Sequence, residues 1–167
     1  YGLMSEACDY DLPFLAKHCD VFYIGGTKVG AMIGEAVVFT GMKAPKYFFT
    51  IVKRHGALLA KGRMLGIQFD TLFTDNLYFK VSQHAINMAV RICDIFKKHG
   101  IAIAYDSPTN QQFVVLPKRL YEALSQKVAF EIWERKCDEE IVCRFVTSWA
   151  TKEEELDELD RILTTLC

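Results

Sequence analysis

The sequence has no long hydrophobic run and no excess of one charge. Its 20 Lys and Arg residues are balanced by 21 Asp and Glu residues, which gives a formal net charge of −1. A balanced chain offers no electrostatic reason to expect binding to nucleic acid or to an anionic membrane surface. No apolar stretch approaches the roughly 20 residues that a membrane-spanning helix needs. With 51% hydrophobic and 25% charged residues, the composition instead indicates a globular fold.

Cysteine pairs with metal-binding spacing are also absent. None of the six cysteines forms a C-x-x-C pair or has histidines at zinc-finger spacing, so we expect no metal site. We interpret the cysteines as free thiols, buried or partly exposed, in the reducing cytoplasm. A disulfide framework is the alternative, and it is disfavoured because the chain has enough apolar residues to build a core without cross-links. The residues concerned are Cys8, Cys19, Cys93, Cys137, Cys143 and Cys167.

An initiator methionine is missing too, because the sequence begins at Tyr1. We therefore expect a fragment or a processed piece of a longer protein. Its 167 residues are enough for one ordinary domain or for parts of two.

The first half of the chain mixes short helices with β-forming segments. Asp11 and Pro13 suit the start of a helix that runs to His18. Two apolar runs, 19–24 and 35–39, predict buried strands of the kind found in parallel sheets. A weakly helical stretch at 53–73 contains three glycines, which indicate breaks or close approaches, because each costs a helix interior roughly 1 kcal/mol.

The second half predicts a compact α/β unit. Apolar residues from Val81 to Phe96 recur at steps of four and three, which predicts one helix over 77–99 that ends before Gly100. A capping box is expected at Thr151 and Glu154, at the start of the last helix. We divide the chain into domains at 1–78 and 79–167, the second with an antiparallel sheet covered by helices. The remaining expected elements are strands at 101–105, 112–116, 128–133 and 141–149 and a helix at 118–127.

Chemistry is concentrated in the segment Gly25-Gly26-Thr27-Lys28-Val29-Gly30. A P-loop is excluded, because Thr27 precedes the lysine instead of following it and a strand soon follows. A lysine at a strand end can act as a Schiff-base nucleophile when burial or a nearby cation keeps its amine neutral. Taken alone, this spacing fits a solvated loop lysine better.

Four segments in order resemble low-specificity L-threonine aldolases and the related β-eliminating lyases. These are pyridoxal-phosphate enzymes of fold type I, the aspartate-aminotransferase fold. The similar segments are 20–36 (DVFYIGGTKVGAMIGEA), 54–66 (RHGALLAKGRMLG), 107–111 (SPTNQ) and 144–149 (RFVTSW). They span nearly the whole chain, which is more specific than one lysine. The resemblance implies the C-terminal part of the large cofactor-binding domain, followed by the small C-terminal α/β domain.

The resemblance implies that three residues bind the cofactor. Lys28 would bind pyridoxal 5'-phosphate covalently as a Schiff base. Thr27 would place its hydroxyl near the cofactor, although a threonine at a strand end also bonds readily to its own backbone. Lys61 stands where the family places a basic residue that reaches the cofactor phosphate, often from a neighbouring subunit. The family usually has arginine there, and a solvated surface charge is the alternative for Lys61.

Arg144 is the candidate for binding substrate. Alternation along its strand puts Ile141, Cys143, Phe145 and Thr147 on one face, and Arg144 with its valine neighbours on the other. Chemistry alone favours a charge on an edge strand. The resemblance instead implies an arginine that holds the substrate α-carboxylate through two hydrogen bonds. For Asn110 we prefer an ordinary Asx turn.

The resemblance implies aldol cleavage of β-hydroxy-α-amino acids, with L-threonine giving glycine and acetaldehyde. Another pyridoxal-phosphate β-eliminating lyase or an aminotransferase is the nearer alternative. A non-catalytic remnant, or an assembly partner of a separate N-terminal half, is the alternative of another class. The rest of the cofactor site would lie upstream of Tyr1, so we expect this chain alone to be inactive. We expect a cytoplasmic homodimer or homotetramer.

Overall fold

The computed structural model describes residues 4–5, 7–41 and 44–167. The chain divides into two compact units, which are treated separately below. The N-terminal unit is Asp9–Lys80, and the C-terminal unit is Val81–Cys167 together with Tyr1–Cys8. None of the described helices combines the length and the hydrophobicity that spanning a bilayer requires. All six cysteines are described and are free thiols, as predicted.

The N-terminal unit is built from short elements. Asp11 caps the first helix as predicted, because its Oδ1 accepts the Phe14 N–H at 2.8 Å and a proline lies in the first turn. The elements are α1 (Leu12–His18), β1 (Val21–Gly25), the 3₁₀ helix η2 (Thr27–Val29), β2 (Glu35–Phe39), α2 (Phe48–Arg54), α3 (Arg63–Phe73) and the 3₁₀ helix η3 (Thr74–Asn76).

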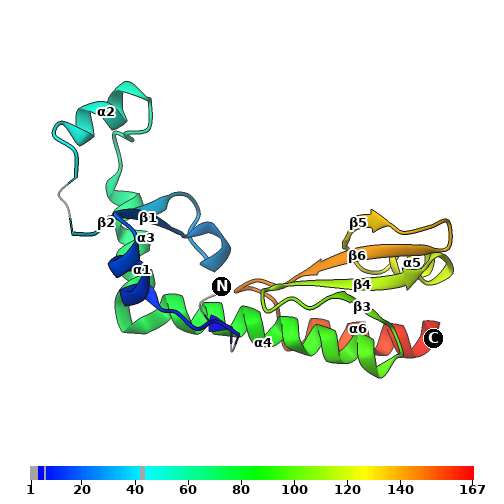
Figure 1. The fold of residues 1–167 in the computed structure, drawn as a ribbon. Helices are drawn as coiled ribbons and strands as arrows, with labels where there is room; N and C mark the ends of the chain where they lie inside the picture. Colours follow the sequence, from blue (N-terminus) through cyan, green and yellow to red (C-terminus); the bar gives the residue numbers. More distant parts are fainter. Residues whose placement is uncertain (1–3, 6, 42–43) are drawn as a thin grey trace. The chain divides into compact units, whose positions relative to one another are not determined.

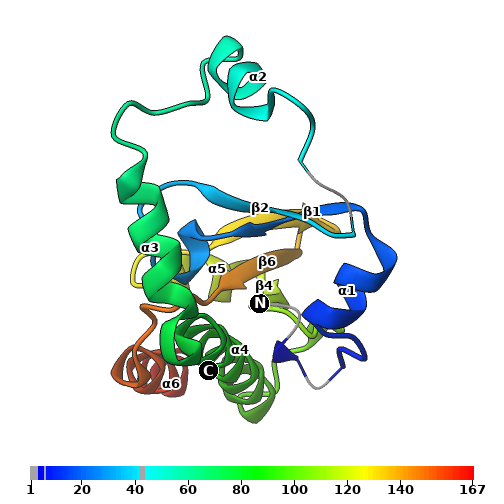
Figure 2. The ribbon, with the colours of Figure 1, turned by 90° about the vertical axis from the view of Figure 1, so that its left-hand side faces the viewer.

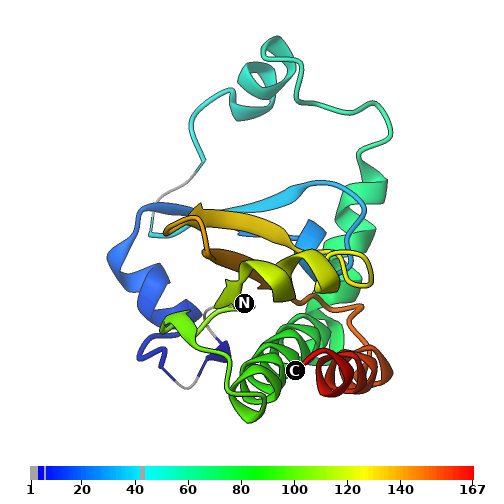
Figure 3. The same cartoon turned by 90° about the vertical axis from the view of Figure 1, so that its right-hand side faces the viewer.

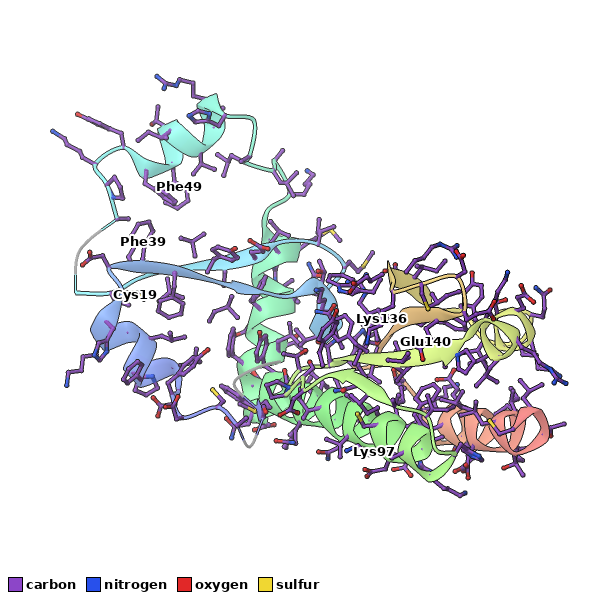
Figure 4. All side chains as sticks on the ribbon, turned by 45° about the vertical axis from the view of Figure 1, so that its right-hand side comes forward. Cys19, Phe39, Phe49, Lys97, Lys136 and Glu140 are labelled. Carbon is purple, nitrogen blue, oxygen red and sulfur yellow. The ribbon has the colours of Figure 1, made fainter. Side chains whose placement is uncertain are left out.

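The strands β1 and β2 form an antiparallel ribbon, with Val21 opposite Phe39 and Gly25 opposite Glu35. The interpretation of these runs as parallel-sheet segments is therefore wrong for the pair as described. The connection is shorter than the dozen or so residues that a parallel crossover requires, so the chain turns back as a hairpin. Figure 4 shows Cys19 and Phe39 at the same end of the ribbon, where the Thr40 N–H donates to the Asp20 carbonyl at 2.9 Å.

Glycines separate α2 from α3, as the sequence predicted. The α2 helix ends at Arg54, and Gly56 follows it with a left-handed φ of 72°. Gly62 is the N-cap residue of α3, and Gly66 is accommodated inside that helix. The expected weakly helical stretch is therefore two helices joined by a loop.

The C-terminal unit contains one antiparallel sheet of four strands in the order β3-β4-β6-β5. This confirms the predicted small antiparallel sheet. The hairpin between β5 and β6 closes where the Lys136 N–H donates to the Glu140 carbonyl at 3.1 Å (Figure 4). The elements are α4 (Leu77–Lys98), which begins in the N-terminal unit, β3 (Ile103–Tyr105), β4 (Gln111–Pro117), α5 (Lys118–Leu124), β5 (Glu131–Arg135), β6 (Glu140–Val146) and α6 (Glu153–Leu166).

One hydrophobic core joins this sheet to its helices. The α4 and α6 helices lie side by side along the sheet in all three ribbon views (Figures 1, 2 and 3). The predicted apolar stripe of α4 enters the core through Met88, Ile92 and Phe96, which confirms the helical period. The other buried members are Ile95, Ile101, Val114, Leu116, Leu124, Ile141, Cys143, Phe145, Leu156, Leu159 and Leu163.

The start of α6 differs by one residue from the prediction. The Glu155 carboxylate accepts the Lys152 N–H at 2.9 Å, so the reciprocal bond of the predicted capping box forms one position later than expected. The Thr151 hydroxyl is already engaged, because it accepts the Ser148 N–H at 2.9 Å in the preceding turn. The box predicted at Thr151 and Glu154 is therefore wrong.

Ion pairs add to the apolar contact between α4 and α6. One carboxylate oxygen of Asp160 lies 2.6 Å from Lys98 Nζ, and the other lies 2.7 Å from His99 Nε2. The hydrogen bonds from Lys98 and then His99 hold the pKa of Asp160 below its usual range. A carboxylate whose pKa is lowered by folding contributes stability above its unfolded pKa and loses it as the pH falls through the folded pKa.

We predict that Asp160→Asn lowers the melting temperature of the protein at pH 7. The difference from wild type should shrink as the pH falls from about 4, the ordinary aspartate pKa, toward the lower pKa of Asp160 in the folded protein, because the wild type then loses the contribution of the ionised carboxylate. Thermal unfolding followed by circular dichroism over this pH range measures both effects. Asp94→Asn is the matched control, since it removes an α4 carboxylate for which the described residues provide no ion pair. A deficit in Asp160→Asn that is independent of pH would contradict the prediction.

Candidate active site

The lysine segment forms a tight turn directly after β1. The Gly26 carbonyl accepts the N–H of Val29 at 3.1 Å and the N–H of Ala31 at 3.0 Å. Gly30 ends the turn with a left-handed φ of 100°, a conformation that glycine adopts without strain. The side chains of Val29 and Ala31 are buried, whereas Lys28 is exposed. The buried side chains of Val29 and Ala31 thus hold the turn in place, while the Lys28 side chain stays accessible to solvent.

The same turn packs closely against α3, and Gly26 and the following Gly34 lie at this contact. A Cβ at Gly26 would lie 2.8 Å from Cζ of Phe69 and 2.9 Å from the Ala31 Cβ. A Cβ at Gly34 would lie 2.8 Å from Leu65 Cδ2. Gln68 of α3 accepts the backbone N–H of Met32 at 2.6 Å. Figure 2 shows α3 beside the ribbon that carries this turn.

Two further contacts hold the start of the turn. The Tyr78 hydroxyl donates to the Gly25 carbonyl at 3.2 Å, and the Tyr78 ring stacks on Phe73 with 5.2 Å between the ring centroids. Burial raises the pKa of Tyr78, so the hydroxyl keeps its proton and remains a donor. The carbonyl that precedes the lysine turn is therefore fixed by a side chain distant in sequence.

The predicted cofactor residues Thr27 and Lys28 lie in this one turn. Among the described residues, neither side chain makes a hydrogen bond or an ion pair, so the predicted alternative of a local backbone bond for Thr27 is not found. Both side chains are exposed. The amine and the hydroxyl are thus available to a ligand.

Lys61 lies in the loop between α2 and α3, and its side chain is exposed. Its carbonyl accepts the Met64 N–H at 3.2 Å, which closes a turn before α3. The chain has no acidic residue between Glu35 and Asp70, whereas it has six Lys or Arg residues there. This segment therefore carries a positive potential that suits an anion such as a phosphate.

Arg144 lies in the C-terminal unit, on the inner strand β6 and not on an edge strand. Phe113 of β4 and Glu131 of β5 are its cross-strand neighbours. The alternation is as predicted, because Ile141 and Phe145 enter the core while Arg144 points to the other face of the sheet.

The Arg144 guanidinium is held from three sides. Its Nη1 donates to Gln111 Oε1 at 2.9 Å, and its Nη2 pairs with the Glu131 carboxylate. The Trp133 ring centroid lies 5.3 Å from the guanidinium carbon, which is cation–π distance. The Arg144 Nε is buried and has no hydrogen-bond partner among the described residues. One donor of this fork is therefore unused.

Asn110 has a structural role different from the predicted Asx turn. It is buried, and its amide donates to the Thr147 carbonyl at 2.7 Å. The Thr147 N–H donates back to the Asn110 carbonyl at 3.0 Å. These two bonds extend the pairing of β4 with β6 beyond the strand ends.

The sequence did not predict which residues contact Arg144. Glu131, Gln111 and Trp133 come from two other strands, and nothing local marks them. One signal was available for Glu131: a hairpin folded tightly about the turn at 136–139 places residue 131 opposite residue 144.

We predict that Gly26→Ala destabilises the protein by about 1–3 kcal/mol, because the added methyl group overpacks the contact with Phe69. Gly25→Ala is the control, since a Cβ at that position meets nothing within 4 Å. Urea unfolding of both variants measures the difference. Equal stability of the two variants would show that the close approach to α3 is unimportant.

No family model matches the chain. Two curated relatives named low-specificity L-threonine aldolase, from a Pseudomonas strain and from Pseudomonas aeruginosa, are each 28% identical over 142 and 144 residues. These matches cover 84% and 85% of this chain and 40% of each relative. The chain thus spans less than half the length of the curated relatives it matches.

Solved structures give the same picture. The threonine aldolase of Leishmania major superimposes with a TM-score of 0.92 at 35% identity, over 98% of this chain and 48% of that one. The serine palmitoyltransferase of Sphingomonas wittichii, at 9% identity and a TM-score of 0.61, shares the fold over 91% of this chain and 40% of its own. The predicted fold type I class is confirmed. In sequence and in fold, the chain is similar to threonine aldolases over about half of their length.

Proposed function

We propose that this chain is part of a pyridoxal-phosphate-dependent enzyme that cleaves β-hydroxy-α-amino acids, with L-threonine giving glycine and acetaldehyde as the model reaction. The observation that carries the proposal is Lys28. Its amine is exposed and unpaired among the described residues, on a turn whose glycines and buried neighbours hold the backbone against α3. The similarity to proteins named threonine aldolase supports the choice of reaction.

The residues of the N-terminal unit suit the cofactor's chemistry. Pyridoxal phosphate needs an amine for its aldehyde and cations for its phosphate, and Lys28 would supply the amine. Lys61 belongs to the segment without acidic residues and would contribute to phosphate binding. Thr27 would present its hydroxyl beside Lys28. When bound, the cofactor supplies an electron sink for the bond that breaks at the substrate Cα.

Arg144 would orient the substrate through its α-carboxylate. Gln111 and Trp133 restrain the guanidinium, which lowers the cost of ordering a long side chain on binding. Two parallel hydrogen bonds to a carboxylate fix both its position and its plane. A substrate held in this way presents its Cα–Cβ bond in one orientation, which is the protein's contribution to rate.

The proposal also covers the oligomeric state of the protein and its cellular compartment. We propose a homodimer or homotetramer in the cytoplasm, where the six free thiols would stay reduced. The divisions 1–78 and 79–167 would correspond to the large and small domains. Residues 1–167 alone would lack activity, since other groups are needed to complete the cofactor site.

We predict that borohydride reduction of the whole cofactor-loaded protein fixes the pyridoxyl group on Lys28, detected by peptide mass spectrometry. Lys28→Ala should lose this label and the aldol cleavage of L-threonine. Lys17→Ala is the control, because Lys17 is an exposed lysine of α1 and should leave both unchanged. A label on a different lysine would refute the assignment. Pyruvate from serine without acetaldehyde from threonine would indicate the β-eliminating alternative.

We also predict that Arg144→Gln raises KM for L-threonine by about 10- to 100-fold, because charge-assisted hydrogen bonds contribute roughly 1.5–3 kcal/mol. Steady-state kinetics of the whole protein measure this change. Arg135→Gln removes an equally charged, exposed side chain from the neighbouring strand β5 and should leave KM unchanged. An unchanged KM in Arg144→Gln would exclude the role in carboxylate binding.

A further inference from the structure

Arg144 already has a carboxylate partner within the chain. Glu131 stands directly opposite it on β5, and the Glu131 Oε2 accepts from Arg144 Nη2. The second terminal nitrogen, Nη1, is engaged by Gln111. The third nitrogen, Nε, has no partner among the described residues. Each terminal nitrogen carries a second N–H, so donors remain, but a second carboxylate at the Nη2 side meets the like charge of Glu131 and competes with it for this nitrogen.

We propose that Glu131 is an internal competitor for the substrate carboxylate: it occupies Arg144 in the free protein and is displaced when the substrate binds. This inference rests on the proposed role of Arg144 in substrate binding. It makes Glu131 a residue that sets substrate affinity, although it takes no part in bond breaking. The exchange is one carboxylate for another, so the charge around Arg144 is the same before and after.

The two partners differ in how firmly they are held, and this decides which one moves. The Glu131 side chain is 66% exposed and stands on the edge strand β5, whereas the Arg144 side chain is 25% exposed on an inner strand. Trp133 and Gln111 restrain Arg144, while Arg144 is the only partner of the Glu131 side chain among the described residues. Glu131 can therefore rotate into water while the guanidinium stays in place.

The free-energy cost of this release is small. An exposed ion pair contributes little to stability, since water solvates the released carboxylate well. A substrate carboxylate can recover more than this if it accepts from both Nη1 and Nη2, because it then makes two charge-assisted hydrogen bonds. A buried competitor would block the site, whereas this exposed one lowers affinity only moderately.

A purely structural ion pair predicts the opposite outcome for the same substitution. If Glu131 serves only to position Arg144, removing its charge loosens the guanidinium and weakens carboxylate binding. If Glu131 competes, removing its charge frees Arg144 and strengthens binding. The sign of the change in affinity therefore separates the two roles.

Trp133 provides a direct probe of this site. The chain has only two tryptophans, so Trp149→Phe leaves Trp133, beside Arg144, as the one tryptophan of this chain. In that background, the whole cofactor-loaded protein is titrated with L-threonine and, separately, with sodium acetate, which has a carboxylate but no amine. If the whole protein has further tryptophans, 5-fluorotryptophan placed at position 133 gives a signal that belongs to this residue alone.

We expect Glu131→Gln to lower Kd for both ligands by about two- to five-fold. KM for L-threonine should fall by the same factor with kcat unchanged, because only carboxylate binding is affected. Glu134→Gln is the matched control: it removes the same charge from the same strand, but its carboxylate contacts the Tyr105 hydroxyl at 2.6 Å and not Arg144. Glu134→Gln should leave Kd and KM unchanged. In an Arg144→Gln background, Glu131→Gln should have no effect.

Weaker or unchanged binding in Glu131→Gln would overturn the inference. The two proposals fail in different ways. If L-threonine is cleaved and requires Arg144, but Glu131→Gln does not tighten binding, competition is excluded and the proposed function stands. If acetate binding depends on Arg144 and tightens in Glu131→Gln while no amino acid is cleaved, the competition is supported and the proposed function fails.

Discussion

The alternation of side chains along β6 connects the hydrophobic core to the candidate carboxylate site. The ring centroid of Phe145 lies 4.8 Å from that of Phe96 in α4 and 4.7 Å from that of Phe130 before β5, which fixes the strand against both segments. Because successive residues of a strand point to opposite faces, the burial of Phe145 forces Arg144 to the other face. A register slip of one residue would exchange the two positions, so the core packing determines where the guanidinium stands.

In the other unit, too, packing of neighbouring residues determines where the functional side chain, Lys28, is placed. The backbone of the lysine turn is brought against α3 at Gly26, where an added Cβ would lie under 3.0 Å from Phe69 and Ala31, and Val29 and Ala31 are buried beside it. The amine of Lys28 can be exposed without being mobile in its backbone, because the residues on either side are packed. A nucleophile needs this combination of access and fixed position.

Competition by Glu131 gives the Arg144 site a tunable affinity. A guanidinium restrained by Gln111 and Trp133 is prepared for a carboxylate, and such a site would bind many small anions if it were left open. By competing for Arg144, the exposed Glu131 carboxylate lowers the affinity of the site for all small anions. Ligands that make contacts beyond the carboxylate would overcome this competition most easily, so specificity comes from contacts that simple anions cannot make.

The sequence by itself determined the features that depend on neighbours along the chain. The α4 helix follows from its apolar period, the break between α2 and α3 from glycines, and the opposite faces of Phe145 and Arg144 from strand alternation. The motif around Lys28 could be identified because its residues are contiguous. Only the tertiary structure decided that β1 and β2 pair antiparallel, that Thr151 is used by the preceding turn, and that Glu131 occupies Arg144. Each of these depends on which distant segment supplies a hydrogen-bond partner, and local periodicity carries no information about that choice.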